Sequence, residues 1–274
     1  MRILEDRRPT LASWPKRIYD WRELPRRFQP GLEAWRAQGL PPGNVTYIPR
    51  ISQYAAGGAE YATAWLGDQV LIQTGGQRGV EELRFCGADV AMVDYYVELL
   101  RCTVTISLGE ERGGEGAVFS YNKTKEDQLL PILLLSLGRE AGYRPAVDHP
   151  AAEPFQTLQR ESYAMYNNSK LCYRFGTEIR DYIWFLGRNR GLARLNKQKP
   201  EHFLARMDAG LVAIRTDFYG RRTSYIPWKR LGKAEVREEQ GQAQLFLSAE
   251  DRPAVQWPLL GGQREQAEAF LAAL

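Results

Sequence analysis

The sequence predicts a mainly β protein made of two similar halves, each a curved antiparallel β-sandwich or partly open barrel closed by a C-terminal amphipathic helix. Three observations lead to this prediction: many short runs rich in Val, Ile, Thr and Tyr, an order of segments that occurs twice, and a helical spacing of apolar residues at the end of each half. The chain has 274 residues, which is the length of two domains of ordinary size.

Each half contains six runs with the composition of β-strands, and glycine or charged residues separate them as in hairpin turns. In the first half these runs are 60–65, 69–74, 80–85, 89–97, 101–108 and 116–121. In the second half they are 202–206, 210–216, 222–228, 231–238, 242–249 and 253–258.

The segments of the first half have counterparts in the same order in the second half. LGDQVLIQT at 66–74 matches DAGLVAIRT at 208–216, with a small turn, an apolar run and a closing threonine in both. Further matches pair FCGADVAMV with WKRLGKAEV, and VTISL with LFLSA. Because the matches keep their order along the chain, we interpret them as a duplication.

One amphipathic helix is predicted to close each half. Two sets of residues have the spacing that places four side chains on one helical face: Leu130, Leu133, Leu134 and Leu137, and Ala267, Phe270, Leu271 and Leu274. We expect Phe270 and Leu271 to form the buried face of the last helix. Thr124 and Asp127 form a candidate capping box for the first, in which Pro131 predicts a kink or a later start.

The order of LARMDAGLVAIRTD, RRTSYIPWKRLGKAEV, GQAQLFLSA and a closing helix resembles the pleckstrin-homology-like (PH-like) domains of bacterial proteins. The segment TSYIPWKRLGKAEV is similar to the strand of that family that leads into an Ile-Pro step. The likeness covers roughly 45–140 and 165–274. It implies tandem binding or assembly modules, because members of the family share no catalytic residues.

The predicted organisation therefore has four parts. A basic, aromatic N-terminal arm at 1–44 precedes a first PH-like domain at 45–142, and a linker at 143–164 leads to a second at 165–274. Trp14, Trp21, Phe28 and Trp35 in the arm are spaced seven residues apart, but its prolines exclude one continuous helix. Trp14, Trp21 and Trp35 are candidate docking residues for a partner. The alternative is a strap that buries these aromatic side chains on its own domain.

The segment 187–200 is the most basic part of the chain and the candidate anion-binding site. It carries five cations and no acid: Arg188, Arg190, Arg194, Lys197 and Lys199. In lipid-binding members of the family a basic hairpin near the first strands holds the lipid head group, although the usual upstream lysine is missing here. The alternative is a solvated basic loop.

No metal or cofactor is predicted, because the two histidines, His149 and His202, have no Cys or His at ligand spacing. The three cysteines Cys86, Cys102 and Cys172 form no CxxC pair, which indicates reduced thiols and a cytoplasmic protein. The chain has no predicted secretory signal or transmembrane segment, since its longest apolar stretch, 129–137, is too short to cross a bilayer.

These features predict a non-enzymatic binding or assembly protein whose partner is another protein or a second copy. The net charge of +4 favours neither a membrane nor nucleic acid by itself. A peripheral binder of anionic lipid is the first alternative. An enzyme with a site between the domains and a single-stranded nucleic-acid binder are further alternatives, and nucleic acid is the less favoured partner.

Overall fold

The structure is a computed structural model that describes residues 14–50, 59–187, 199–218 and 220–274. The chain divides into two compact units, both discontinuous in sequence. The first unit comprises the chain up to Val90 together with Leu100–Thr105 and Gly116–Tyr143, and the second comprises Ala91–Leu99, Ile106–Glu115 and Arg144–Leu274. The predicted domain boundaries stay predictions.

The predicted mainly β, antiparallel class is confirmed, and none of the three sheets closes into a barrel within the described residues. Each predicted strand run is a strand, with ends that differ by at most two residues. These strands are β3 (Glu60–Leu66), β4 (Gln69–Gly76), β5 (Gly79–Cys86), β6 (Val90–Glu98), β7 (Arg101–Leu108), β8 (Gly116–Asn122), β10 (Glu201–Met207), β11 (Gly210–Thr216), β12 (Arg221–Pro227), β13 (Leu231–Glu239), β14 (Gln242–Ala249) and β15 (Arg252–Pro258).

Among the described residues, the other regular elements besides short 3-10 helices are three strands and five α-helices. The strands are β1 (Lys16–Arg17), β2 (Val45–Ile48) and β9 (Ile179–Leu186). The helices are α2 (Glu33–Ala37), α3 (Leu130–Ser136), α4 (Glu153–Glu161), α5 (Tyr163–Ser169) and α6 (Gln263–Ala272). Both halves thus show the six predicted strands in order, preceded by one further strand (β2 or β9) and followed by a helix, and the predicted linker 143–164 contains α4.

The start of α3 settles two expectations. Pro131 lies in the first turn, where its missing amide proton costs no hydrogen bond, so the prediction of a later start is confirmed. The prediction of a capping box formed by Thr124 and Asp127 is wrong, because Asn122 takes the cap position of the 3-10 helix that precedes α3. Its side chain accepts a hydrogen bond of 3.0 Å from the backbone N–H of Thr124.

The first unit contains a five-stranded sheet in the order β1-β2-β3-β4-β5. One face packs against the arm through a single apolar cluster. This cluster joins Ile18, Leu24, Phe28, Leu32, Trp35 and Leu40 of the arm to Val45, Ala62, Ala64 and Leu71 of the sheet. Since successive residues of a strand point to opposite faces, Thr63, Val70 and Ile72 lie on the other face, and α3 contacts β3 and β4.

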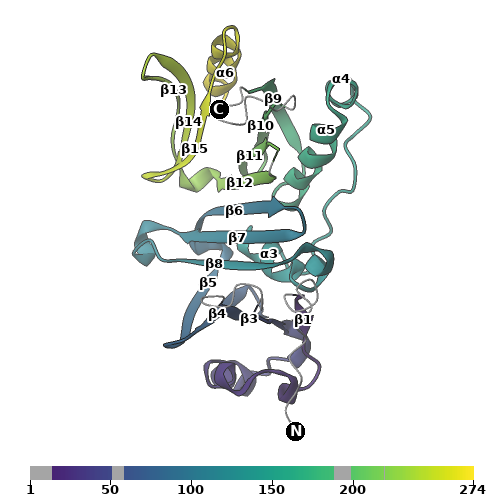
Figure 1. Ribbon diagram of the computed structural model, residues 1–274, viewed down its shortest axis with the longest axis vertical. Helices are drawn as coiled ribbons and strands as arrows, with labels where there is room; N and C mark the ends of the chain where they lie inside the picture. Colours follow the sequence, from purple (N-terminus) through teal and green to yellow (C-terminus); the bar gives the residue numbers. More distant parts are fainter. Residues whose placement is uncertain (1–13, 51–58, 188–198, 219) are drawn as a thin grey trace. The chain divides into compact units, whose positions relative to one another are not determined.

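The second unit contains two sheets. One contains β6-β12-β11-β10-β9, which are five strands of a seven-stranded sheet that continues from β6 to β7 and β8, and the other runs in the order β13-β14-β15. Figure 1 shows the three-stranded sheet facing β10 and β11, with α6 beside it. One apolar cluster contains side chains from both sheets and from α6, among them Leu204, Ile226, Leu245 and Phe270. This packing is that of a sandwich closed by its last helix.

The apolar face of α6 agrees in part with its prediction. Ala267 and Phe270 are buried, whereas Leu271 is only half-buried. Leu274 is 40% exposed, because α6 ends at Ala272 and the last two residues leave its face.

Candidate functional site

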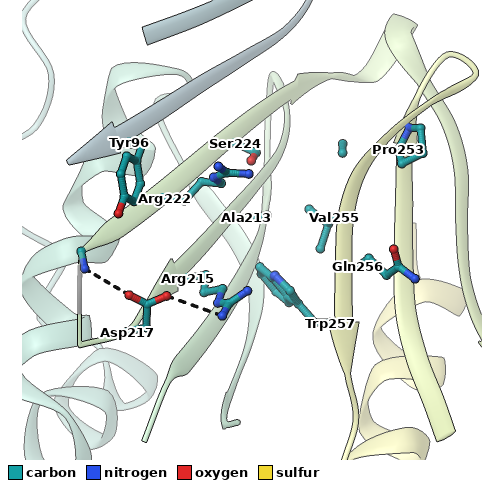
Figure 2. Close-up of a pocket in the computed structure, with 12 residues that line it drawn as sticks. Tyr96, Ala213, Arg215, Asp217, Arg222, Ser224, Pro253, Val255, Gln256 and Trp257 are labelled. Atoms are coloured by element: carbon teal, nitrogen blue, oxygen red, sulfur yellow. Dashed lines mark hydrogen bonds and ion pairs between the residues drawn. The ribbon is translucent and has the colours of Figure 1, made fainter. Parts of the chain in front are cut away.

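A pocket of about 460 Å³ opens in the second unit between the sheet containing β11 and β12 and the neighbouring strand β15. Figure 2 shows Arg215 and Arg222 on one wall and Val255 and Trp257 on the other. The lining residues are Tyr96, Ala213, Arg215, Asp217, Gly220, Arg222, Ser224, Pro253, Ala254, Val255, Gln256 and Trp257.

The strand register places the polar lining in rows. Arg215 of β11 lies directly opposite Arg222 of β12, which lies opposite Tyr96 of β6. The neighbouring row on the same face contains Ala213 and Ser224 as partners. The two arginines therefore stand side by side next to a row of small side chains.

The two guanidinium groups have different surroundings. Arg215 Nη2 lies 3.5 Å from Asp217 Oδ2, and Asp217 Oδ1 also accepts a hydrogen bond of 3.1 Å from the backbone N–H of Gly220. The guanidinium carbon of Arg222 lies 5.8 Å from the ring centroid of Tyr96. Among the residues that the structure describes, Arg222 forms no ion pair.

A carboxyl group, that of Asp94, continues the second row on the neighbouring strand β6. Ser224 is cross-strand partner to Asp94 of β6, and its hydroxyl donates a hydrogen bond to Asp94 Oδ1. Burial raises the pKa of Asp94, while the hydrogen bond from Ser224 and the charge of Arg222 oppose that shift. Asp94 is therefore a second acidic group beside the pocket, in addition to Asp217.

The aromatic wall extends to a buried histidine. The ring of Trp257 lies 4.7 Å from that of His202, which is stacked on Phe185 at 5.3 Å. His202 is the cross-strand partner of Arg215. Burial lowers the pKa of His202 to about 3, and the charge of Arg215 acts in the same direction. His202 is therefore neutral at physiological pH and adds no positive charge.

The basic segment lies mostly outside the described residues, which exclude Arg188, Arg190, Arg194 and Lys197. Lys199 is described and exposed. The segment connects β9 to β10, and the backbone N–H of Gly187 donates a hydrogen bond of 2.7 Å to the carbonyl of Pro200. Binding by this segment stays a prediction.

The aromatic residues of the arm are packed to different extents. Trp35 is 6% exposed and Phe28 is fully buried, which favours the strap alternative for these two side chains. Trp14 and Trp21 are half-buried, and the guanidinium of Arg36 lies 4.5 Å from the ring of Trp21. Docking by Trp14 and Trp21 stays a prediction.

His149 belongs to a buried polar cluster within the second unit. Its Nε2 lies 2.9 Å from the hydroxyl of Ser169, its Nδ1 lies 3.0 Å from the hydroxyl of Tyr173, and its ring stacks on Phe155. His149 and Ser169 are both buried, so a substrate would have no access to this pair. The described residues contain no group of three metal-ligating side chains, and all three cysteines are free.

A second cavity, of about 580 Å³, lies in the first unit. Trp65, Cys86, Leu135 and Arg139 contribute to its lining, and the guanidinium of Arg139 lies 4.3 Å from the ring of Tyr143. Asp68 and Glu140 also line this cavity, so negative charges accompany its arginine. Unlike the pocket of the second unit, this cavity holds no pair of adjacent cations.

No protein-family model, curated protein or solved structure matches this chain. The site must therefore be interpreted from its own chemistry. No helix in the described part of the chain has both the length and the apolar content needed to span a bilayer.

Sequence reasoning missed Arg215 and Arg222, although a signal for them exists. They stand at equal distances from the middle of the hairpin IRTDFYGRRT, with Asp217 and Gly220 as its turn residues. A hairpin closed at Thr216 and Arg221 necessarily makes Arg215 and Arg222 cross-strand partners. The opposite wall carries no comparable signal, because β15 belongs to the other sheet.

Proposed function

We propose that the protein is a non-enzymatic binding and assembly module made of two PH-like repeats, and that the pocket of the second unit is a site where it binds an anionic group. The repeated order of six strands and a helix supports the two repeats. The observation that carries the binding role is the direct pairing of Arg215 with Arg222 beside an open pocket. Such a pair attracts anions without needing any chemical step.

Binding without turnover is testable by incubating the full chain with a panel of small organic acids and the matched neutral amides. We expect acids to raise the melting temperature, because a ligand at a hundred times its Kd stabilises the native state by about 2.7 kcal/mol. Mass spectrometry of the incubated mixture should recover every compound unchanged. Consumption of a compound would assign the protein to enzymes, and acids that stabilise no better than their amides would contradict anion binding.

A second candidate function is the binding of anionic lipid by the basic segment 187–200. The observation that favours it is the position of the segment between β9 and β10, where the Gly187–Pro200 hydrogen bond joins the ends of the two strands. All five of its charged residues are cations. Each cation near an anionic bilayer contributes about 1 kcal/mol to binding.

The double variant Arg188→Ala/Arg190→Ala should therefore bind vesicles of phosphatidylserine and phosphatidylcholine at least tenfold more weakly in a flotation assay, since two lost contacts amount to about 2 kcal/mol. The wild-type affinity should also fall as salt rises, because salt screens exposed charges. The matched control is Arg180→Ala/Lys233→Ala, which removes two exposed cations elsewhere in the second unit. Equal losses of vesicle affinity in both double variants would show that net charge alone causes the effect, and would contradict binding by this segment.

A further inference from the structure

We infer that the pocket of the second unit binds a small organic monocarboxylate with an aromatic or apolar body, and that Arg215 and Arg222 hold its carboxylate. This inference rests on the proposed binding function and adds the class of ligand. It concerns residues that the sequence analysis did not single out, and it is independent of the basic segment 187–200.

The arginine pair carries an electrostatic cost of its own. Like charges placed directly opposite on neighbouring strands destabilise a sheet. Arg215 and Arg222 occupy such positions, and only Arg215 has an ion pair among the described residues, at 3.5 Å to Asp217. An anion between the two guanidinium groups would replace this repulsion with attraction. An arrangement that is unfavourable without a ligand and favourable with one is typical of a binding site.

The charge of the pocket limits the charge of a ligand that it can hold. The lining contains two guanidinium cations and one carboxylate, that of Asp217, which leaves a net charge of at most +1, because the carboxyl group of Asp94 lies beside Ser224 and acts on Arg222. Neutral His202 adds nothing to this charge. A monoanion balances it, whereas a phosphate dianion would exceed it and would be repelled by Asp217. The charge therefore favours a carboxylate over a phosphate.

The wall opposite the arginines determines what the rest of the ligand can be. The wall that faces the arginines belongs to β15, where Val255 and Trp257 contribute apolar side chains and Gln256 contributes a polar one. A volume of about 460 Å³ lies within the range of ordinary small-molecule sites, and the lining combines an apolar part with a larger polar part. A flat aromatic body could lie on Trp257 while its carboxylate reaches the guanidinium groups, which bind carboxylates through paired hydrogen bonds.

The experiment titrates the full chain with 2-naphthoate, 2-naphthamide and inorganic phosphate, and measures each Kd by calorimetry or by NMR chemical shifts. The variants are Arg215→Gln and Arg222→Gln, which remove one charge each from the pocket. The matched control is Arg180→Gln, because Arg180 is an exposed arginine on β9 of the same sheet. The melting temperature of each unliganded variant checks that it folds.

We expect 2-naphthoate to bind the wild type and Arg180→Gln equally, and to bind each pocket variant at least tenfold more weakly. The amide and phosphate should bind the wild type more weakly than 2-naphthoate. Arg222→Gln should also melt at or above the wild-type temperature, because it removes the repulsion from Arg215. A purely structural role for Arg222 would lower that temperature instead.

Three results would overturn the inference. Unchanged affinity of 2-naphthoate for Arg222→Gln would place the binding outside this pocket, so the role as a binding protein would stand but its assignment to the pocket would not. Tighter binding of phosphate than of 2-naphthoate would refute the ligand class while keeping the site. Absence of binding by all three probes would refute the pocket as an anion site, and the wider panel of acids would then decide whether the binding function stands.

Discussion

Phe270→Ala should lower the free energy of unfolding by about 3–5 kcal/mol, as truncation of a buried phenylalanine does in other cores. Phe270 is 4% exposed and lies in the cluster that joins both sheets of the second unit to α6. Alanine would remove most of the contact surface of the helix and leave a cavity in its place. Urea unfolding at neutral pH measures the effect.

Two other positions at the end of the chain provide graded controls. Leu274 is 40% exposed, so Leu274→Ala should change the free energy of unfolding by no more than about 0.5 kcal/mol. Leu271 is half-buried. Leu271→Ala should therefore lower the free energy of unfolding by an amount between the effects of Phe270→Ala and Leu274→Ala. If Phe270→Ala were as mild as Leu274→Ala, α6 would not close the sandwich.

Acidification from pH 7 to pH 5 should destabilise the wild type, and His202→Leu should remove about 2 kcal/mol of that loss. The pKa of His202 is about 3 in the folded protein, against 6.5 for an unperturbed histidine. Below pH 6.5 the unfolded chain therefore takes up a proton that the folded chain does not. The stability of the fold then falls by about 1.4 kcal/mol per pH unit until the folded pKa is reached.

Other groups with shifted pKa values affect this measurement in different ways. Burial also lowers the pKa of His149, so this residue contributes in the same direction and should leave a residual slope in His202→Leu. Asp94 acts oppositely, because its raised pKa lets the folded state bind a proton more readily. The lowered pKa values of Glu111 and Asp148, both about 2, act below pH 5. Urea unfolding at pH 7, 6 and 5 gives the slopes, and equal slopes for both proteins would show that His202 titrates normally in the fold.

The strands were predictable because local chemistry defines them. Glycine and charged residues bound each run, and β-branched and aromatic residues fill it, so every predicted run is a strand. The same reasoning failed at helix ends. Leu274 continues the spacing of α6 in sequence, but spacing does not show that the helix has already ended at Ala272.

Only one wall of the pocket, the one that carries the two arginines, could be predicted from the sequence. The hairpin between β11 and β12 pairs Arg215 with Arg222, and a turn at Asp217–Gly220 suffices to deduce that pairing. The apolar wall depends on which strand of the other sheet faces the hairpin, and no local pattern contains that information. The contribution of Tyr96 also depends on a long-range pairing, because β6 lies more than a hundred residues before β12.

The pairing of β6 with β12 has a consequence for dividing the chain. A fragment that starts at Arg144 would lack β6, so β12 would become an open edge with unpaired N–H and C=O groups. Exposed edges of this kind template the addition of strands from other molecules, and such a fragment would tend to aggregate. It would also lose Tyr96 and Asp94 from the surroundings of the pocket. Although the order of its elements is repeated, the chain therefore cannot be divided at Arg144 into two independent pieces.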